Sequence, residues 1–131
     1  MQFRERRPLI LVVEDVEETR NGIEQLLAAV GYSVAPAKDE AEAVVRARSS
    51  LPDLILISLG VDAVQLVAMA QRLRERADLG SATPIVLFCV PTVEEGAEVE
   101  IAPNLYLTRP DNFDQLRRLF SRLLQSRPQA C

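Results

Sequence analysis

The sequence predicts an α/β domain built on a doubly wound, five-stranded parallel sheet with helices on both faces. Short apolar runs alternate five times with longer segments in which apolar residues recur at helical spacing. The runs are continuous rather than alternating in polarity, which is typical of strands covered on both faces. We expect the strand order 2-1-3-4-5, because that order brings the ends of strands 1, 3 and 5 together around one cleft.

The first half of the chain predicts two strand–helix units. Residues 9–13 (LILVV) are the first strand, and a helix follows in which apolar residues fall at i, i+3, i+4 and i+7 (23, 26, 27 and 30). Residues 32–35 are a short second strand. Asp39 can cap a second helix, whose apolar positions run from residue 41 to residue 51.

The second half continues the alternation, with one irregular stretch. Residues 54–57 and 85–88 predict the third and fourth strands, with a helix over 64–77 between them. Residues 105–107 predict the fifth strand, and residues 113–124 repeat apolar side chains at helical spacing after a possible cap at Asp111.

The irregular stretch lies between the fourth and fifth strands, over residues 91–104. It contains Gly96 and Pro103, and its central run VEEGAEVE offers few apolar residues for a helix to bury. We therefore expect a short or poorly ordered fourth helix here, and an altered surface around it.

Composition excludes several classes of function. The 131 residues suit one domain, which we place over 1–131 with a core at 9–124 and frayed ends. A net charge of −4 argues against nucleic-acid binding, and no apolar run approaches the ~20 residues of a membrane span. The charged start leads into too short an apolar run for a signal peptide, and two cysteines do not make a disulfide framework. We expect a soluble cytoplasmic protein.

Candidate functional residues follow the strands, because the working groups of an open parallel sheet lie beyond the carboxyl ends of its strands. Glu14 and Asp15 follow the first strand, Ser58 the third, Cys89 the fourth and Arg109 the fifth. Two carboxylates, a hydroxyl, a thiol and a guanidinium would therefore meet at one cleft. The chain has no histidine, so a histidine base or metal ligand is excluded.

These residues carry a resemblance to a known family. The run ILVVEDVEETR resembles the opening of a bacterial response-regulator receiver domain, and PDLILISL, PIVLFCV and YLTRPDNFDQL resemble its third, fourth and fifth strands. The likeness covers residues 9–124 in the family's order. It implies a flavodoxin-like fold and a role in two-component, or phosphorelay, signal transduction.

The departures from the family fall on its chemistry. Ser58 stands at the phosphoacceptor-equivalent position, where receivers carry an aspartate that takes a phosphoryl group from a histidine kinase. Cys89 stands where they carry threonine or serine, and Arg109 where they carry lysine. A serine hydroxyl needs an adjacent base before it can attack phosphorus, a thiol is a weak hydrogen-bond donor, and arginine does not replace lysine conservatively.

Other positions match the family. Glu14 and Asp15 align with the acidic pair that binds metal, and Tyr106 and Pro110 join Cys89 and Arg109 as switch-equivalent positions. Because only two carboxylates remain, we expect no cofactor beyond weak or vestigial Mg²⁺ binding at this pair. The alternatives are purely structural roles, in which the two acids cap the first helix and Tyr106 is a fixed packing residue.

The resemblance and its departures together predict a pseudo-receiver that acts by protein–protein interaction without phosphorylation, and that is not an enzyme. The alternative is a phosphorylatable receiver, or a doubly wound enzyme, with Ser58 or Cys89 as nucleophile. No G-x-S-x-G motif and no phosphate-binding glycine loop supports an enzyme. The expected partner is a signalling protein docking on the fourth helix, fifth strand and fifth helix, where a homodimer could also form; neither nucleic acid nor membrane is expected.

One contact at the site is also predicted. With no aspartate after the third strand, the guanidinium of Arg109 is free to form an ion pair with Glu14 or Asp15. Such a pair would close the pocket that phosphate and metal occupy in the family.

Overall fold

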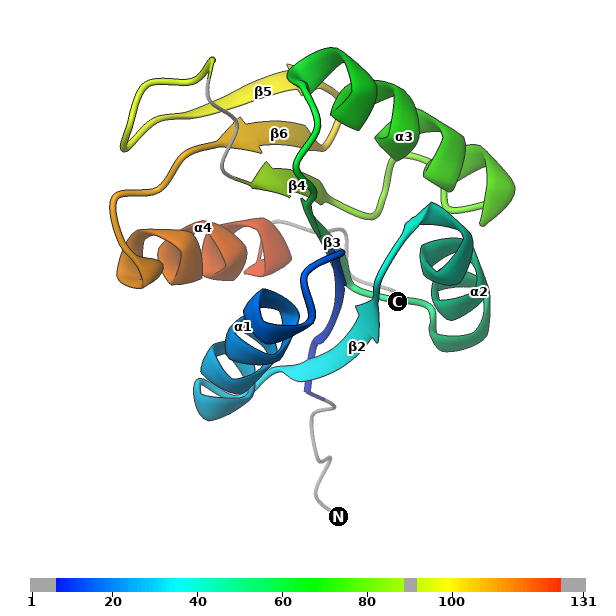
Figure 1. Ribbon diagram of the computed structural model, residues 1–131, viewed down its shortest axis with the longest axis horizontal. Helices are drawn as coiled ribbons and strands as arrows, with labels where there is room; N and C mark the ends of the chain where they lie inside the picture. Colours follow the sequence, from blue (N-terminus) through cyan, green and yellow to red (C-terminus); the bar gives the residue numbers. More distant parts are fainter. Residues whose placement is uncertain (1–6, 89–91, 126–131) are drawn as a thin grey trace.

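The sheet has five parallel strands, as predicted, and a sixth that the sequence reading did not anticipate. The computed structural model describes residues 7–88 and 92–125, and its sheet order is β2-β1-β3-β4-β6-β5 (Figure 1). The strands are β1 (Leu9–Glu14), β2 (Ser33–Ala37), β3 (Leu54–Ser58), β4 (Ile85–Phe88), β5 (Glu98–Ala102) and β6 (Leu105–Thr108). The first five in this order are parallel to their neighbours, which confirms the predicted fold class and the order 2-1-3-4-5 for the predicted strands.

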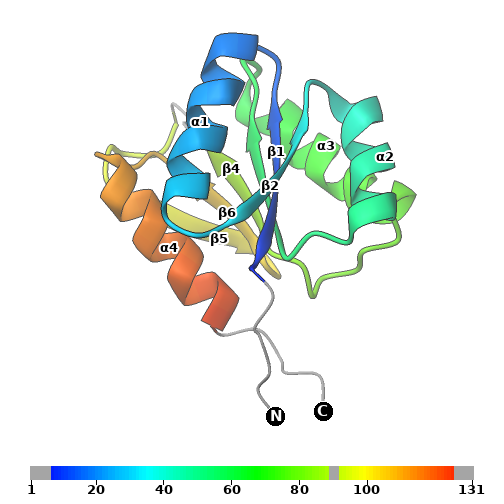
Figure 2. The same cartoon turned by 90° about the horizontal axis from the view of Figure 1, so that it is seen from below.

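Four helices cover the two faces of the sheet. They are α1 (Glu17–Ala29), α2 (Glu40–Ser50), α3 (Ala63–Arg76) and α4 (Phe113–Gln125). Figure 2 shows α1 and α4 on one face and α2 and α3 on the other. Along the described chain, residues 7–88 and 92–125, no helix has the length and apolar character to cross a membrane.

Alternate residues of the central strands supply two separate cores. Leu11, Val13, Ile55 and Ile57 point to the α2/α3 side, where Leu66 and Leu73 meet them. Their neighbours in sequence, from Ile10 to Leu56, point to the α1/α4 side and pack against Phe120. Because both faces are covered, β1 and β3 have no solvent side, which explains their unbroken apolar runs.

The predicted fourth helix is wrong for residues 98–102, which form β5 instead. The segment EVEIA alternates polar and apolar side chains with a period of two, the spacing of a strand. Pro103 and Asn104 then make a tight connection to β6, with Asn104 in the left-handed region at φ 57°. The strand runs antiparallel to β6, with an irregularity between Glu100 and Ala102.

Side-chain caps begin three of the helices. Asp39 caps α2 by accepting a hydrogen bond from the Glu42 N–H (2.9 Å), which confirms the predicted cap. The cap predicted at Asp111 is wrong by one residue, because Asn112 accepts from the Gln115 N–H (2.9 Å). Asp62 caps α3 in the same way.

Two glycines offer a matched test of this backbone. Gly96 has a φ of +86°, and a Cβ added there would lie 3.0 Å from an Asp111 carboxylate oxygen, whereas a Cβ on Gly22 in α1 would meet nothing within 4 Å. We predict that Gly96→Ala lowers the free energy of unfolding by about 1–2 kcal/mol. Gly22→Ala should raise it by about 0.5–1 kcal/mol, because alanine is the better helix former.

Urea denaturation of the two variants beside the parent protein measures both changes. Equal effects of the same sign would contradict the assignment of Gly96 to a left-handed turn against Asp111.

Candidate functional site

The predicted site forms where β1 and β3 end side by side. Glu14 and Ser58 are register partners at the carboxyl ends of these strands. The Ser58 hydroxyl donates a hydrogen bond to Glu14 Oε1 at 2.8 Å. Glu14 is only 5% exposed, so this bond satisfies one oxygen of a buried carboxyl group.

The second oxygen of Glu14 is also engaged. Glu14 Oε2 accepts from the main-chain N–H of Val16 at 3.0 Å, in the turn that leads into α1. Arg20, one turn into that helix, donates from Nη1 to the main-chain carbonyl of Glu14 at 2.8 Å. Sequence reasoning missed Arg20, because nothing in its spacing separates it from the other exposed charges of an amphipathic helix.

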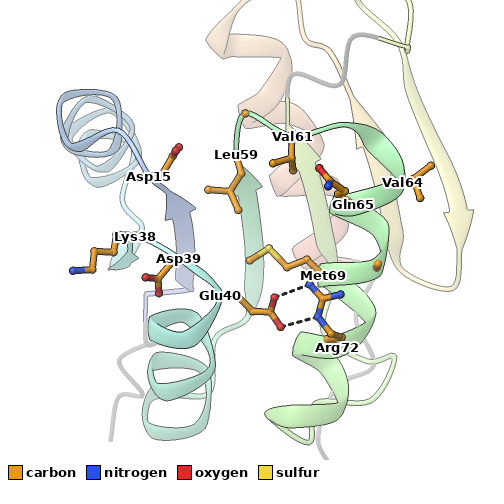
Figure 3. A pocket seen from close by; sticks show the side chains of 12 residues that line it. Asp15, Lys38, Asp39, Glu40, Leu59, Val61, Val64, Gln65, Met69 and Arg72 are labelled. Atoms are coloured by element: carbon orange, nitrogen blue, oxygen red, sulfur yellow. Dashed lines mark hydrogen bonds and ion pairs between the residues drawn. The ribbon is translucent and has the colours of Figure 1, made fainter.

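Asp15, the other half of the acidic pair, is exposed. It lines a cleft of about 570 Å³ between the start of α2 and the side of α3 (Figure 3). Lys38 and Asp39 stand at one wall of this cleft, and Val61 and Val64 at the other. The acidic pair is therefore divided between a buried bonded carboxyl and a solvent-facing one.

A charged bridge closes the floor of the cleft. The Glu40 carboxylate of α2 accepts from Arg72 Nη2 at 2.7 Å and Nε at 3.0 Å (Figure 3). It also accepts from Arg76 Nη1 at 3.2 Å. The bonds from Arg72 are the main cause of a lowered pKa for the Glu40 carboxyl. The bridge ties α2 to α3 below the site.

The predicted ion pair of Arg109 is wrong. Arg109 is exposed, and over residues 7–88 and 92–125 no carboxylate forms an ion pair with its guanidinium. Its main chain is held instead, because its N–H donates to the Ala97 carbonyl (3.1 Å) and its carbonyl accepts from the Gly96 N–H (2.6 Å). Both oxygens of Glu14 already have hydrogen-bond donors without the guanidinium, because the Ser58 hydroxyl and the Val16 N–H donate to them.

The remaining switch-equivalent positions are separated from the acidic pair or lie outside the described residues. Tyr106 is half-buried on β6, and its hydroxyl donates to Asn104 Oδ1 at 3.4 Å. Burial, and then the nearby Glu100 carboxylate, raise the pKa of Tyr106. Pro110 lines a small apolar cavity of about 220 Å³ between α1 and the start of α4. Cys89 lies outside the described residues.

A second polar cluster, which sequence reasoning missed, holds the segment before β5 against α4. Gln115 Nε2 donates to the Gly96 carbonyl (2.5 Å), while its Oε1 accepts from the Asp111 N–H (2.8 Å). Thr108, 1% exposed at the end of β6, donates to the Ala97 carbonyl at 3.3 Å. The signal that could have found Gln115 is its place three residues after the Asn112 cap.

Comparison with known proteins decides the family. The family model of the response regulator receiver domain matches residues 10–121. The chain belongs to this family. The transcriptional regulatory protein DltR of Streptococcus agalactiae is 29% identical to the receiver over 109 residues, which are 82% of this chain and 47% of DltR. KdpE of Staphylococcus aureus, also a transcriptional regulatory protein, is 25% identical over 122 residues, 89% of this chain and 51% of KdpE. The chain thus spans about half the length of these curated relatives.

Solved structures resemble the receiver along nearly its whole length. The receiver domain of the hybrid histidine kinase CckA is 25% identical, with a TM-score of 0.62 over 89% of this chain and 99% of that one. The response regulator TrrA of Thermotoga maritima, in complex with Mg²⁺-BeF, is 22% identical, with a TM-score of 0.68 over 88% and 98%. The second likeness shows the fold alone.

The residues present do not fit the Mg²⁺ site that the family implies. Mg²⁺ is held by carboxylate oxygens in near-ideal octahedral geometry. Here both Glu14 oxygens accept hydrogen bonds. Ser58 is the donor of one of them, so its side chain is a hydrogen-bond donor to the carboxyl group and does not add a carboxylate ligand beside it. Among the described residues no group of three or more acidic or cysteine side chains is placed to hold a metal ion.

The Ser58–Glu14 hydrogen bond predicts an effect on stability. Ser58→Ala leaves Glu14 Oε1 buried without its donor, which should lower the free energy of unfolding by about 1–3 kcal/mol. Arg109→Ala is the control, and it should change stability by less than about 0.5 kcal/mol because the side chain is exposed and unpaired in the described chain. Chemical denaturation at neutral pH measures the loss of stability in both variants. A larger loss in Arg109→Ala than in Ser58→Ala would contradict this assignment and support the Arg109 ion pair instead.

The Glu40 bridge predicts a dependence of stability on pH. Since the pKa of Glu40 is lowered in the folded protein, its bridge stabilises the fold above the unfolded pKa of about 4.3 and is lost as the pH falls through the folded value. The midpoint temperature of the parent should therefore exceed that of Glu40→Gln at pH 7, and the gap should shrink progressively below about pH 4. A gap that is constant from pH 7 to pH 3 would contradict the bridge.

Proposed function

We propose that this receiver domain is a pseudo-receiver: it transmits a signal by binding a partner protein, without being phosphorylated and without acting as an enzyme. The observation that carries the proposal is the state of the phosphoacceptor-equivalent position. Ser58 offers a hydroxyl whose proton is donated to Glu14, in place of the ionised carboxylate that attacks phosphorus in receivers.

The surroundings of Ser58 support the same conclusion. Phosphoryl transfer in the family requires Mg²⁺, and each of the two oxygens of Glu14 already accepts a hydrogen bond from this chain. It also requires a cation at the position of Arg109, whose side chain is exposed while its main chain is bonded to Gly96 and Ala97. We expect Mg²⁺ binding to be weak and to involve the exposed Asp15 rather than a site shared with Glu14.

The relatives suggest the setting in which the domain works. DltR and KdpE are transcriptional regulatory proteins about twice the length of the matched region. We infer that the chain supplies the receiver function of a two-component pathway, in the cytoplasm, and that its partner is a signalling protein rather than nucleic acid or membrane. The proposed docking side is the surface formed by β5, β6 and α4. These elements stand where the sequence predicted the fourth helix, the fifth strand and the fifth helix.

One observation favours a second candidate function. A carboxyl oxygen 2.8 Å from a serine hydroxyl is within reach to act as its general base. In that case Ser58 would be a phosphoacceptor, with Glu14 taking the proton as the oxygen–phosphorus bond forms. This candidate and the pseudo-receiver predict opposite results in one experiment.

We predict that incubation with acetyl phosphate and Mg²⁺ leaves the mass of the intact protein unchanged, because no ionised carboxylate stands at the acceptor position. Intact-protein mass spectrometry measures the result, and Ser58→Ala is the matched control. Ser58→Asp should also remain largely unmodified, since Glu14 and Arg109 are not arranged to bind metal and phosphate.

Two results would contradict the proposal. A stoichiometric gain of one phosphoryl group that resists hydroxylamine and is lost in Ser58→Ala would establish the serine phosphoacceptor. A hydroxylamine-sensitive gain would place an acyl phosphate on a carboxylate elsewhere in the chain.

A further inference from the structure

The open edge of β5 differs from the other edge of the sheet. At the far edge, β2 carries Pro36, which has no N–H to offer, and the Pro36 carbonyl accepts from Arg46 Nε at 3.2 Å. Proline and covering side chains are the usual means by which a sheet edge is closed to another strand. β5 has neither proline nor lysine between Glu98 and Ala102, and within the described residues it pairs with β6 alone.

The main-chain groups at this edge can be assigned. Along an antiparallel strand, residues turn their N–H and C=O groups alternately toward the paired neighbour and away from it. The Ala97 carbonyl faces β6, because it accepts from the Arg109 N–H. Val99, which pairs with Leu107, therefore also faces β6, and Glu98 and Glu100 present their main-chain groups to the open side.

The side chains of the edge are apolar and acidic. Val99 and Ile101 are 46% and 41% exposed on this outermost strand. Four glutamates lie within seven residues, at positions 94, 95, 98 and 100. Glu98 has Arg122 as an ion-pair partner. The Glu100 carboxylate accepts a hydrogen bond from the Asn104 N–H at 3.0 Å, and no arginine or lysine of the described chain forms an ion pair with it.

The charges disfavour a second copy of this chain at the edge. If two β5 strands paired antiparallel with their outward-facing glutamates in register, a glutamate would lie opposite a glutamate, with 98 opposite 98, 98 opposite 100 or 100 opposite 100. Like charges directly opposite each other destabilise a strand pair. The same charges favour a strand that brings lysine or arginine to these positions.

We propose that the β5 edge is a docking site for an extended segment of a partner protein in which basic residues alternate with apolar ones. The segment adds to the sheet as a seventh strand, and its main chain bonds to Glu98 and Glu100. Its basic side chains lie opposite the carboxylates of these two residues, and its apolar side chains cover Val99 and Ile101. The inference rests on the proposed function, since it names the surface and the partner chemistry of a receiver that signals by binding.

The test uses the full chain and a short synthetic peptide of alternating lysine and valine, without a phosphodonor. A peptide of the same composition with its lysines grouped at one end is the matched control. In an NMR titration we expect amide shifts centred on residues 98–102, slower hydrogen exchange at Glu98 and Glu100, and affinity that falls as salt is added. The control peptide should bind more weakly.

Three variants separate strand addition from general charge attraction. Glu100→Pro removes the outward N–H, together with the carboxylate and its bond from the Asn104 N–H, while leaving the β6-facing pair at Val99 in place; it should abolish binding of the alternating peptide. Glu100→Gln keeps the N–H and should weaken binding about two- to five-fold. Glu75→Gln removes the same charge from the exposed side of α3 and should leave the affinity unchanged.

The inference is overturned if Glu100→Pro binds as tightly as the parent, if both peptides bind equally well, or if sedimentation shows a dimer that Glu100→Pro disrupts. Its failure is distinct from failure of the proposed function. If the peptide bound β5 only after the protein had been phosphorylated, the proposed independence of phosphorylation would be refuted, and the proposed docking site on β5 would not. An unmodified protein that binds no peptide would refute the edge site alone.

Discussion

The structure depends on the complete burial of β1 between two layers of helices. Residues Ile10 to Val13 have no solvent exposure, and β1 is paired on both sides, with β2 and with β3. Along such a strand every main-chain group is bonded within the sheet and every side chain must be apolar. Polar groups are admitted only where the strand ends, which is why Glu14 and Ser58 meet there.

The same burial governs what the end of β1 can do. A carboxyl group that is 5% exposed must find hydrogen-bond donors, and Glu14 obtains them from Ser58 and from the Val16 N–H. In a receiver that binds metal, those oxygens would face the ion. With serine at the end of β3, the corner formed by Glu14 and Ser58 is joined by a hydrogen bond, and the register of the sheet that supports it is regular.

The changes on the other side of the molecule follow from a different constraint. Residues 98–102 have too few apolar side chains to bury a helix, but their alternating pattern suits the outside of a sheet. Hydrogen bonds from Gln115 and Thr108 to the Gly96 and Ala97 carbonyls hold the segment that precedes this strand. Where the sequence predicted a fourth helix, the structure therefore has the edge strand of the sheet.

The sequence by itself determined the fold class, the five parallel strands, the Asp39 cap and the meeting of Glu14 with Ser58. The fold class, the strands and the meeting of Glu14 with Ser58 depend on local periodicity and on the rule that parallel strands end at the same edge, and the cap depends on the preference of aspartate for the position before a helix. Only the tertiary structure decided that residues 98–102 pair with β6, that Arg109 lies in solvent and that Gln115 bonds to Gly96. Each of these depends on which distant group comes within about 3 Å of another, and a pattern along the chain does not contain that distance. The ion pair expected of Arg109 failed for this reason: charge complementarity was visible in the sequence, whereas the neutral donors that already satisfied Glu14 became visible only in three dimensions.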